Sequence, residues 1–440
     1  MSSQTATPMS VEDARILALE SGPIRGHTLK VLVLEGAPEA LPVDELRADM
    51  SRRLTAERRW RQRLVPASGT PSGLAWQDDP EFDIARHVQT RQASARPVDD
   101  QELRRIVADM MGTPLDRARP LWTLDVIPRL ADGRSALVWK VHHCLADGMT
   151  TMRVGSQVLW MDEVPQARVI PLNRSAPPGS RAQVAAGMRL LRLAGYRGLL
   201  LREFRRVRDL SPLAGAVGSD RAVAFARCDL DELRALGKAV GPQVTVNDVL
   251  LSVVAGALRT WLRNRRLPIT PMKVQVPVSM HPQLASADKN GNQDSFLFVS
   301  LPLSEPDPVA RVRGVAKATR LRKNRHDARA IYALRQSLVH APAPMRRALQ
   351  HIVQGPHEYS LNVSNVPGPA GPISVAGRRV EALYSLAEVA PHHGLRVAAI
   401  SLEGSLFVGL CADPQLVPDI DELAVGIEAS VDDLHQRLGR

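Results

Sequence analysis

The chain has 440 residues, more than one hydrophobic core usually serves, so we expect two domains. Its 44% hydrophobic and 23% charged residues are ordinary for a soluble globular protein. The net charge of +11 suits nucleic acid, anionic lipid or a polyphosphate ligand, and it equally fits the Arg-rich composition of a high-GC bacterial genome.

Several classes of protein are disfavoured by what the sequence lacks. No apolar run approaches the ~20 residues that a membrane-spanning helix needs, and the N-terminus lacks the layout of a signal peptide. There is no P-loop, dinucleotide glycine pattern or His-Glu-x-x-His. Cys144, Cys228 and Cys411 have no metal or redox spacing, which indicates a reducing compartment. We expect a cytoplasmic protein that touches a membrane, if at all, from that side.

The first hundred residues predict a small helix at 10–21, a strand at 29–34 and helices at 41–56 and 99–111. Lys30 stands in the strand where an apolar residue is expected. Residues 58–64 are rich in arginine, and with Trp60 as the only aromatic there they favour a solvated edge strand over a nucleic-acid contact.

Pro120, Leu121 and Trp122 form a proline-punctuated loop that leads into a strand at 123–127. Taken alone, this block is explained by the packing of a bulky tryptophan. A turn at 132–134 then leads into the next strand.

The stretch 135–148, SALVWKVHHCLADG, is the most informative part of the chain. Its two-residue alternation predicts a strand on which His143 shares a face with Trp139 and Val141, while His142 points the other way. A histidine at a strand end is well placed for general base catalysis, because its neutral form dominates at pH 7. Asp147 can orient the loop or the imidazole, and Gly148 lets a substrate approach the backbone.

Two other readings of this stretch are disfavoured. A Cys144/His143 nucleophile pair is unfavourable because neighbours on a strand point to opposite faces. A metal site is unfavourable because adjacent strand histidines diverge, so we expect no metal.

After a helix at 149–161, composition divides the chain. Residues 1–164 form the N-terminal domain, 165–220 a linker, and 221–440 the C-terminal domain. Within the linker, 181–208 is a basic amphipathic helix, which is typical either of a membrane-surface element or of a helix packed between domains.

In the C-terminal part, Asn247 and Asp248 begin a long apolar helix that runs to 262. Strands are predicted at 222–230, 274–279, 295–303, 361–366, 395–401 and 405–411, and helices at 229–239, 309–323, 328–338 and 419–437. The helix at 309–323 has a basic face that could reach phosphates. His392-His393-Gly394 is a second histidine pair, but no Asp-Gly follows it, so we assign it no catalytic role.

Five blocks in order carry a family resemblance, and they are Pro120-Leu121-Trp122, 142–148, Asn247-Asp248, Asn290-Gly291-Asn292 and 364–369 with Pro367-Gly368. In these the chain resembles the bacterial wax ester synthase/diacylglycerol acyltransferase family of the chloramphenicol acetyltransferase-like superfamily. Met280-His281 stands where the family usually has an arginine, which puts any role there in doubt.

The resemblance implies an α/β fold of two chloramphenicol acetyltransferase-like subdomains, each a mixed sheet with helices, with the active-site channel at their interface. It implies acyl-CoA as co-substrate without a bound cofactor, diacylglycerol or a long-chain alcohol as acceptor, and no nucleic acid partner. His143 would be the general base, supported by His142, Asp147 and Gly148.

Other roles follow from the resemblance alone. Asn247 and Asn292 are candidates for stabilising the oxyanion, a task that backbone amides could also perform. Structural roles fall to Pro120, Leu121, Trp122, Asp248, Pro367 and Gly368. Two alternatives stay open: a condensation-type or polyketide-associated acyltransferase with another acceptor, and a non-catalytic protein of lipid droplets or membrane surfaces.

Overall fold

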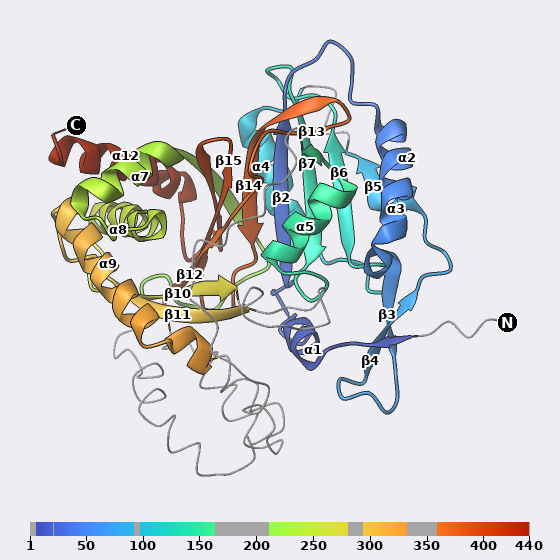
Figure 1. Ribbon diagram of the computed structural model, residues 1–440, viewed down its shortest axis with the longest axis horizontal. Helices are drawn as coiled ribbons and strands as arrows, with labels where there is room; N and C mark the ends of the chain where they lie inside the picture. The colour runs from blue at the N-terminus through green and yellow to red at the C-terminus, as the bar shows by residue number, and fades with distance from the viewer. Residues whose placement is uncertain are drawn as a thin grey trace.

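The computed structural model describes residues 6–20, 22–91, 97–162, 211–279, 294–331 and 359–439. The described chain forms two α/β halves that stand side by side, each built on its own mixed β-sheet with helices (Figure 1). The predicted fold class of two sheet-based subdomains is therefore confirmed.

The first half contains a seven-stranded sheet in the order β5-β6-β7-β2-β14-β13-β8. Its strands are β2 His27–Leu34, β5 Val88–Thr90, β6 Trp122–Ile127, β7 Ser135–His142, β8 Met161–Asp162, β13 Ile373–Val375 and β14 Arg378–Ala387. Its helices are α1 Val11–Leu17, α2 Val43–Arg53, α3 Ile84–His87, α4 Asp100–Gly112 and α5 Gly148–Val158, with 3-10 helices η1 Leu54–Ala56 and η2 Arg58–Arg61. A small sheet adds β1 Thr7–Pro8, β3 Gln62–Pro66 and β4 Leu74–Asp78.

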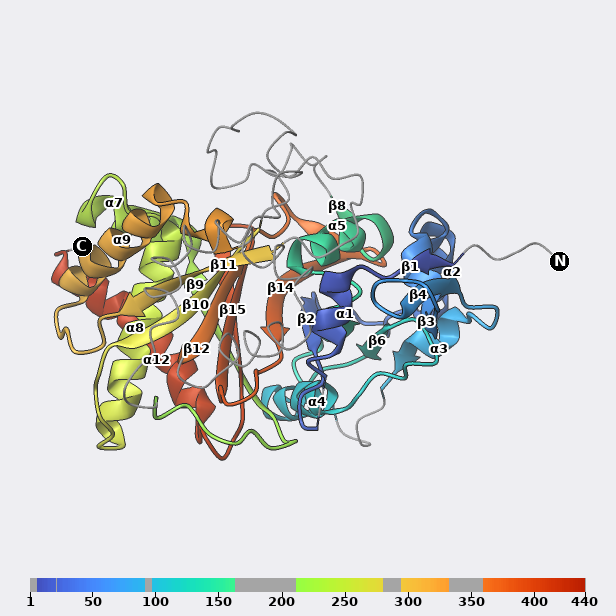
Figure 2. The ribbon, with the colours of Figure 1, turned by 90° about the horizontal axis from the view of Figure 1, so that it is seen from below.

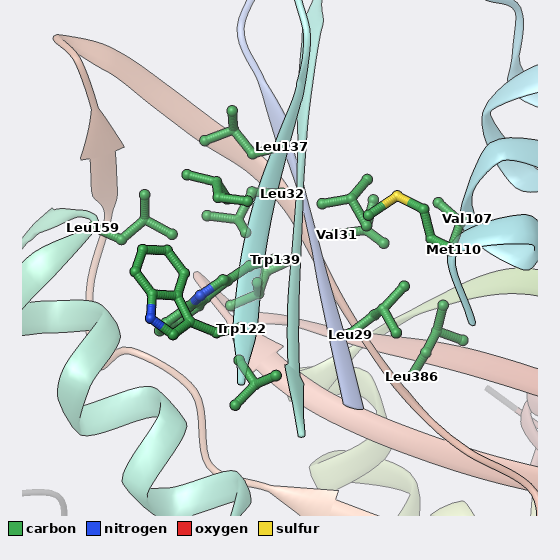
Figure 3. Packing of buried hydrophobic residues seen from close by; sticks show 14 of the residues in the cluster. Leu29, Val31, Leu32, Val107, Met110, Trp122, Leu137, Trp139, Leu159 and Leu386 are labelled. Carbon is green, nitrogen blue, oxygen red and sulfur yellow. The ribbon is translucent and has the colours of Figure 1, made fainter. Parts of the chain in front are cut away.

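Helices α4 and α5 cover opposite faces of the seven-stranded sheet (Figure 2). The strand period puts Leu29 and Val31 on the α4 side and Leu32 and Trp139 on the α5 side (Figure 3). Both faces are covered, so all eight residues of β2 and of β7 are buried. The motif strand therefore runs through the middle of a packed core.

Lys30 is the exception that the sequence signalled. It is buried in β2, and its Nζ donates a hydrogen bond to Ser385 Oγ at 2.6 Å on the neighbouring strand β14. Burial, and secondarily the charge of Arg396, lowers the pKa of Lys30 to about 8. The hydroxyl partner explains how a lysine is accommodated at a core position.

The second half contains a six-stranded sheet in the order β11-β10-β12-β15-β16-β9. Its strands are β9 Ala222–Asp229, β10 Met272–Ser279, β11 Asp294–Leu301, β12 Leu361–Val366, β15 Leu395–Leu402 and β16 Ser405–Ala412. Helices α7 Leu230–Val240, α8 Val246–Asn264, α9 Pro308–Asn324 and α12 Ile420–Arg437 lie on the side away from the first half (Figure 1). They bury the outward side chains of the sheet in a second hydrophobic core.

The sheets do not divide the chain at a single point in the sequence. Strands β13 and β14 come from late in the chain, yet β14 pairs with β2 in the first sheet. The range 221–440 therefore contains strands of both sheets. A buried ion pair, Arg221 Nε to Glu388 Oε1 at 2.6 Å, adds a link beside this crossing strand.

Some predicted features lie outside the described residues. These are 163–210, with the basic helix predicted at 181–208, then 280–293 with Asn292, and 332–358. Within the described ranges, no helix combines the length and apolar character needed to cross a membrane.

Candidate active site

The histidine motif forms a turn that joins β7 to α5. The alternation of the sequence predicts that His143 shares a strand face with Trp139 and Val141. This prediction is wrong, because the strand ends at His142 and His143 lies in the turn. Asp147 caps α5, because its Oδ1 accepts a hydrogen bond from the Thr150 N–H at 2.7 Å. Asp147 is therefore the residue at which the turn ends and the helix begins, and it is fully buried.

Two backbone hydrogen bonds hold the histidines in place. The His143 N–H donates to the Gly26 carbonyl at 2.8 Å, and the His142 N–H donates to the Leu121 carbonyl at 3.0 Å. Gly26 has a φ of +66°, and a side chain there would lie 3.0 Å from His142 Nε2. A glycine is therefore required beside the motif on both conformational and steric grounds.

His142 is a buried structural link rather than an exposed reactive group. Its Nδ1 accepts the Cys144 N–H at 3.1 Å, and its Nε2 lies 3.4 Å from Glu20 Oε2. Glu20 in turn accepts a hydrogen bond from Arg117 Nε at 3.0 Å. These contacts fix the ring and the turn that follows it.

His143 is partly exposed and uncharged at neutral pH. Burial, and secondarily the positive charge of Arg396, lower its pKa to about 4, while Asp147 acts in the opposite direction. A neutral imidazole can accept a proton, which is the property a general base requires.

Cys144 does not form a thiolate beside this histidine. Its side chain is buried, and burial raises the pKa of the thiol well above its ordinary value. A Cys/His nucleophile pair therefore has no support in the structure.

The inward face of the second sheet, which is the face turned toward the first half, lies against the motif. A side chain added at Gly148 would come within 3.0 Å of Val366 Cγ2, so the first turn of α5 touches the end of β12. Asn362 lies on the same face of β12, two strand periods before Val366. Arg396, paired with Asn362 in register on β15, is the cation that acts on His143. The site therefore draws on both halves of the chain.

Sequence reasoning missed Asn362 and Arg396. The polar alternation in LNVSNV and the single arginine in LRVAAISL were available signals. These signals do not show to which side of the sheet the two side chains point. The side that faces the histidine depends on pairings between residues far apart in the chain.

The Pro120-Leu121-Trp122 block positions the motif strand from the neighbouring strand. Leu121 provides the carbonyl that holds His142, and Trp122 Nε1 donates to the Trp60 carbonyl at 2.8 Å. All three residues of the block are buried. The block thus anchors β6 beside β7.

The Pro367-Gly368 block lies at the end of β12. The Gly368 N–H donates to Ser401 Oγ at 3.1 Å, and a side chain at Gly368 would collide with the Ser401 carbonyl. The close approach of β12 to β15 therefore requires glycine at this position.

Asp248 and Asn247 lie in the first turn of α8. Asp248 forms a capping box with Thr245, and its Oδ1 accepts a hydrogen bond from Thr319 Oγ1 at 2.6 Å, which ties α8 to α9. Asn247 belongs to the same helix, which lies in the outer layer of helices (Figure 1). Asn292 lies outside the described residues.

The second histidine pair lies before β15. His393 is buried and stacks on Tyr359, with ring centroids 3.9 Å apart. Burial lowers its pKa to about 4. Among the described residues, no group of three or more His, Cys, Asp or Glu side chains is gathered as a metal site.

Two α/β halves, with a neutral histidine in a strand-to-helix turn at the face of the second sheet, define an acyltransferase of the His-His-x-x-x-Asp-Gly class. The wax ester synthase/diacylglycerol acyltransferase catalytic domain model matches residues 9–209, and the C-terminal domain model of the same family matches residues 290–435. The chain belongs to this family, and it is an acyltransferase.

Curated relatives match over most of their length. The Mycobacterium tuberculosis protein named "Probable diacyglycerol O-acyltransferase tgs1" is 30% identical over 421 residues, 91% of this chain and 89% of the relative. The protein named tgs2 from the same organism is 28% identical over 460 residues, 98% of this chain and 99% of the relative.

Solved structures agree on the fold. The Marinobacter aquaeolei wax ester synthase/diacylglycerol acyltransferase has a TM-score of 0.72 at 23% identity, covering 99% of this chain and 100% of that one. A mutant starter condensation domain of rhizomide synthetase RzmA, in complex with C8-CoA and Leu-SNAC, has a TM-score of 0.63 at 14% identity, covering 99% of this chain and 95% of that one. At these identities the likeness concerns the fold alone.

Proposed function

We propose that the protein transfers a long-chain acyl group from acyl-CoA to the hydroxyl of diacylglycerol or of a long-chain alcohol. The observation that carries the proposal is the neutral His143, held in its turn against the inward face of the second sheet. Membership in the wax ester synthase/diacylglycerol acyltransferase family, and the names of the mycobacterial relatives, support the two acceptors.

In the proposed reaction, His143 removes the proton of the acceptor hydroxyl as that oxygen attacks the thioester carbonyl. The tetrahedral intermediate then collapses, the C–S bond breaks, and the imidazolium returns the proton to the departing thiolate. Direct transfer needs both substrates held together, which a site built from the histidine turn of the first half and the sheet face of the second half favours.

The oxyanion requires hydrogen-bond donors close to His143. Asn247 stands in the outer helix layer, so backbone N–H groups in the first turn of α5 fit this role better among the described residues. Asn292 remains a candidate by resemblance to the family.

The test is CoA release from palmitoyl-CoA with diacylglycerol, with hexadecanol, or without acceptor. We expect acceptor-dependent release, and a fall of about 100-fold or more in His143→Ala, because general base catalysis is removed. His142→Asn, which keeps a polar side chain at the neighbouring position, controls for effects on the turn. A folded His143→Ala enzyme with most of its turnover would overturn the mechanism. Absence of release with either acceptor would overturn the proposed substrates.

We also infer that the protein meets its lipid acceptor at the cytoplasmic face of a membrane or at a lipid-body surface. Support comes from the exposed side of α9, where Arg313, Lys317 and Arg320 follow helical spacing and Leu321 is 47% exposed. None of these three cations has an ion-pair partner within the described part of the chain. Such a face suits anionic lipid.

A further inference from the structure

A row of polar side chains crosses the inward face of the second sheet. Gln275 on β10, Asn362 on β12 and Arg396 on β15 are register partners on three adjacent strands. Because register partners share a face, the three side chains form a line across the sheet. Cys411, the next residue in register, is buried in the core of the first half, which shows that this face is turned toward that half.

The row contains an unused acceptor. Asn362 Nδ2 donates to Gln275 Oε1 at 2.9 Å, while Asn362 Oδ1 is buried and finds no hydrogen-bond partner within the described residues. Asn362 is only 7% exposed. A buried carbonyl oxygen without a hydrogen-bond donor is energetically unfavourable. A donor group of a bound ligand would satisfy it.

The neighbouring amide supplies the complementary donor. Gln275 uses its Oε1 for Asn362, which leaves its Nε2 without a hydrogen bond in the described part of the chain. The pair thus offers one acceptor, Asn362 Oδ1, beside one donor group, Gln275 Nε2. Secondary amides carry both complementary groups, an N–H for the acceptor and a C=O for the donor.

The row lies close to the reacting centre. Asn362 is four residues from Val366, which contacts the turn at Gly148, a separation of about 13 Å along an extended strand. Arg396, at the end of the row, is near enough to act on His143 electrostatically. A ligand arm that begins at the histidine can therefore extend along β12 to Asn362.

We propose that Gln275 and Asn362 form a subsite for a secondary amide in the arm of the acyl thioester donor. This inference rests on the proposed function, in which the donor is acyl-CoA. The arm of CoA carries two secondary amides between its sulfur and its phosphates, so it offers the required N–H and C=O at a distance from the thioester. Neither acceptor contains an amide: a long-chain alcohol has only its hydroxyl, and diacylglycerol adds ester carbonyls but no N–H.

The test compares donors with and without amides. The three donors are octanoyl-CoA, S-octanoyl-N-acetylcysteamine and the amide-free S-octanoyl-2-mercaptoethanol, each with hexadecanol as acceptor. In Asn362→Leu we expect kcat/KM to fall about tenfold for the donors that bear amides and to stay unchanged for the amide-free donor. Gln275→Leu should show the same selective loss, because it removes the complementary donor.

Several results would overturn the proposed subsite. An equal fall with all three donors, or a rise confined to the KM of hexadecanol, would overturn the subsite. Calorimetric titration with free CoA gives a second readout without turnover, and an unchanged dissociation constant in a folded Asn362→Leu protein would also overturn it. Wild-type inactivity with every donor and also with palmitoyl-CoA would instead refute the proposed function. Circular dichroism shows whether either variant fails to fold, and the other variant then carries the test.

Discussion

At the scale of single residues, the site depends on the electrostatic setting of one imidazole. His143 is kept neutral first by burial and then by Arg396 from the opposite sheet, while the Asp147 carboxylate opposes both. The charge of Arg396 disfavours the protonated form of His143. Its effect is to hold the base in its proton-accepting form over a wider pH range than an exposed histidine would allow.

This setting predicts the acid limb of the pH profile. A base must be unprotonated to act, so kcat/KM should stay level from pH 7 to about 5 and fall as the pH drops through about 4. In Arg396→Gln the nearby positive charge is lost, the pKa of His143 rises toward its ordinary value, and the limb should move to higher pH. Initial rates across the range, with circular dichroism at each pH, measure both.

Arg396→Lys is the matched control, because it retains the charge and should retain the low limb. If the limb of Arg396→Gln coincides with that of the wild type, the charge on β15 does not act on the catalytic base. If the wild-type limb lies near pH 6.5, burial does not lower the pKa of His143.

The residues of the motif could be found from the sequence, but their partners could not. His143 and Asp147 are close in the chain, and residue types at short spacing suffice to recognise them. Arg396 lies more than 250 residues from His143, and its approach depends on sheet register. A register shift of one residue would turn it to the opposite face, and local patterns do not determine that register.

At the scale of elements, the strand-to-helix turn is held by the cap of α5. Asp147 accepts two kinds of hydrogen bond: its Oδ1 receives the Thr150 N–H, and its backbone carbonyl receives Thr151 Oγ1 at 2.8 Å. Only the first depends on the carboxylate side chain. Both the stability of the turn and its catalytic geometry therefore depend on Asp147.

Removing this cap should destabilise the fold. Asp147→Ala leaves the buried Thr150 N–H without its acceptor, so we expect the free energy of unfolding to fall by about 2 kcal/mol. Asp147→Asn keeps an acceptor oxygen of equal capping strength and should lose much less stability. Urea denaturation of the three proteins measures the difference. Equal losses in the two variants would show that charge, rather than the cap, stabilises the turn.

Most elements were predictable because their local patterns are strong. Helix α8, for example, combines a Thr245–Asp248 capping box with a continuous apolar run. Strand β14 was not predicted, although it is ten residues long. Its partner strand β2 lies more than 340 residues away in the chain. Its place in the first sheet therefore depends on the whole fold and not on its own sequence.

At the scale of the whole molecule, the two halves are joined through their interior. Strand β14 completes the first sheet from the C-terminal part of the chain, and Tyr384 on it stacks on Phe225 of β9 with centroids 4.3 Å apart. Arg221 pairs with Glu388 and also donates to the Pro23 carbonyl at 2.7 Å. These ties keep the histidine and the opposite sheet face in fixed relation.

The charge of the whole molecule, +11 in net terms, influences how the protein meets a lipid substrate. If the α9 face docks on anionic lipid, the protein should float with vesicles that contain phosphatidylglycerol and not with pure phosphatidylcholine. Because the attraction is electrostatic, it should weaken as salt rises from 50 mM to 500 mM and the screening length falls below about 10 Å. Replacing the three unpaired α9 cations by glutamine should release most of the protein; these are Arg313, Lys317 and Arg320.

The control removes the same charge elsewhere. Three exposed arginines of the first half serve for this, namely Arg52, Arg105 and Arg129, each changed to glutamine. If net charge alone drives binding, the two triple variants will float equally, and α9 will have no special role. If α9 is the docking face, only its variant will lose vesicle binding. That variant should keep its turnover with dispersed hexadecanol, because α9 lies in the outer helix layer, on the side of the second half away from the first half (Figure 1).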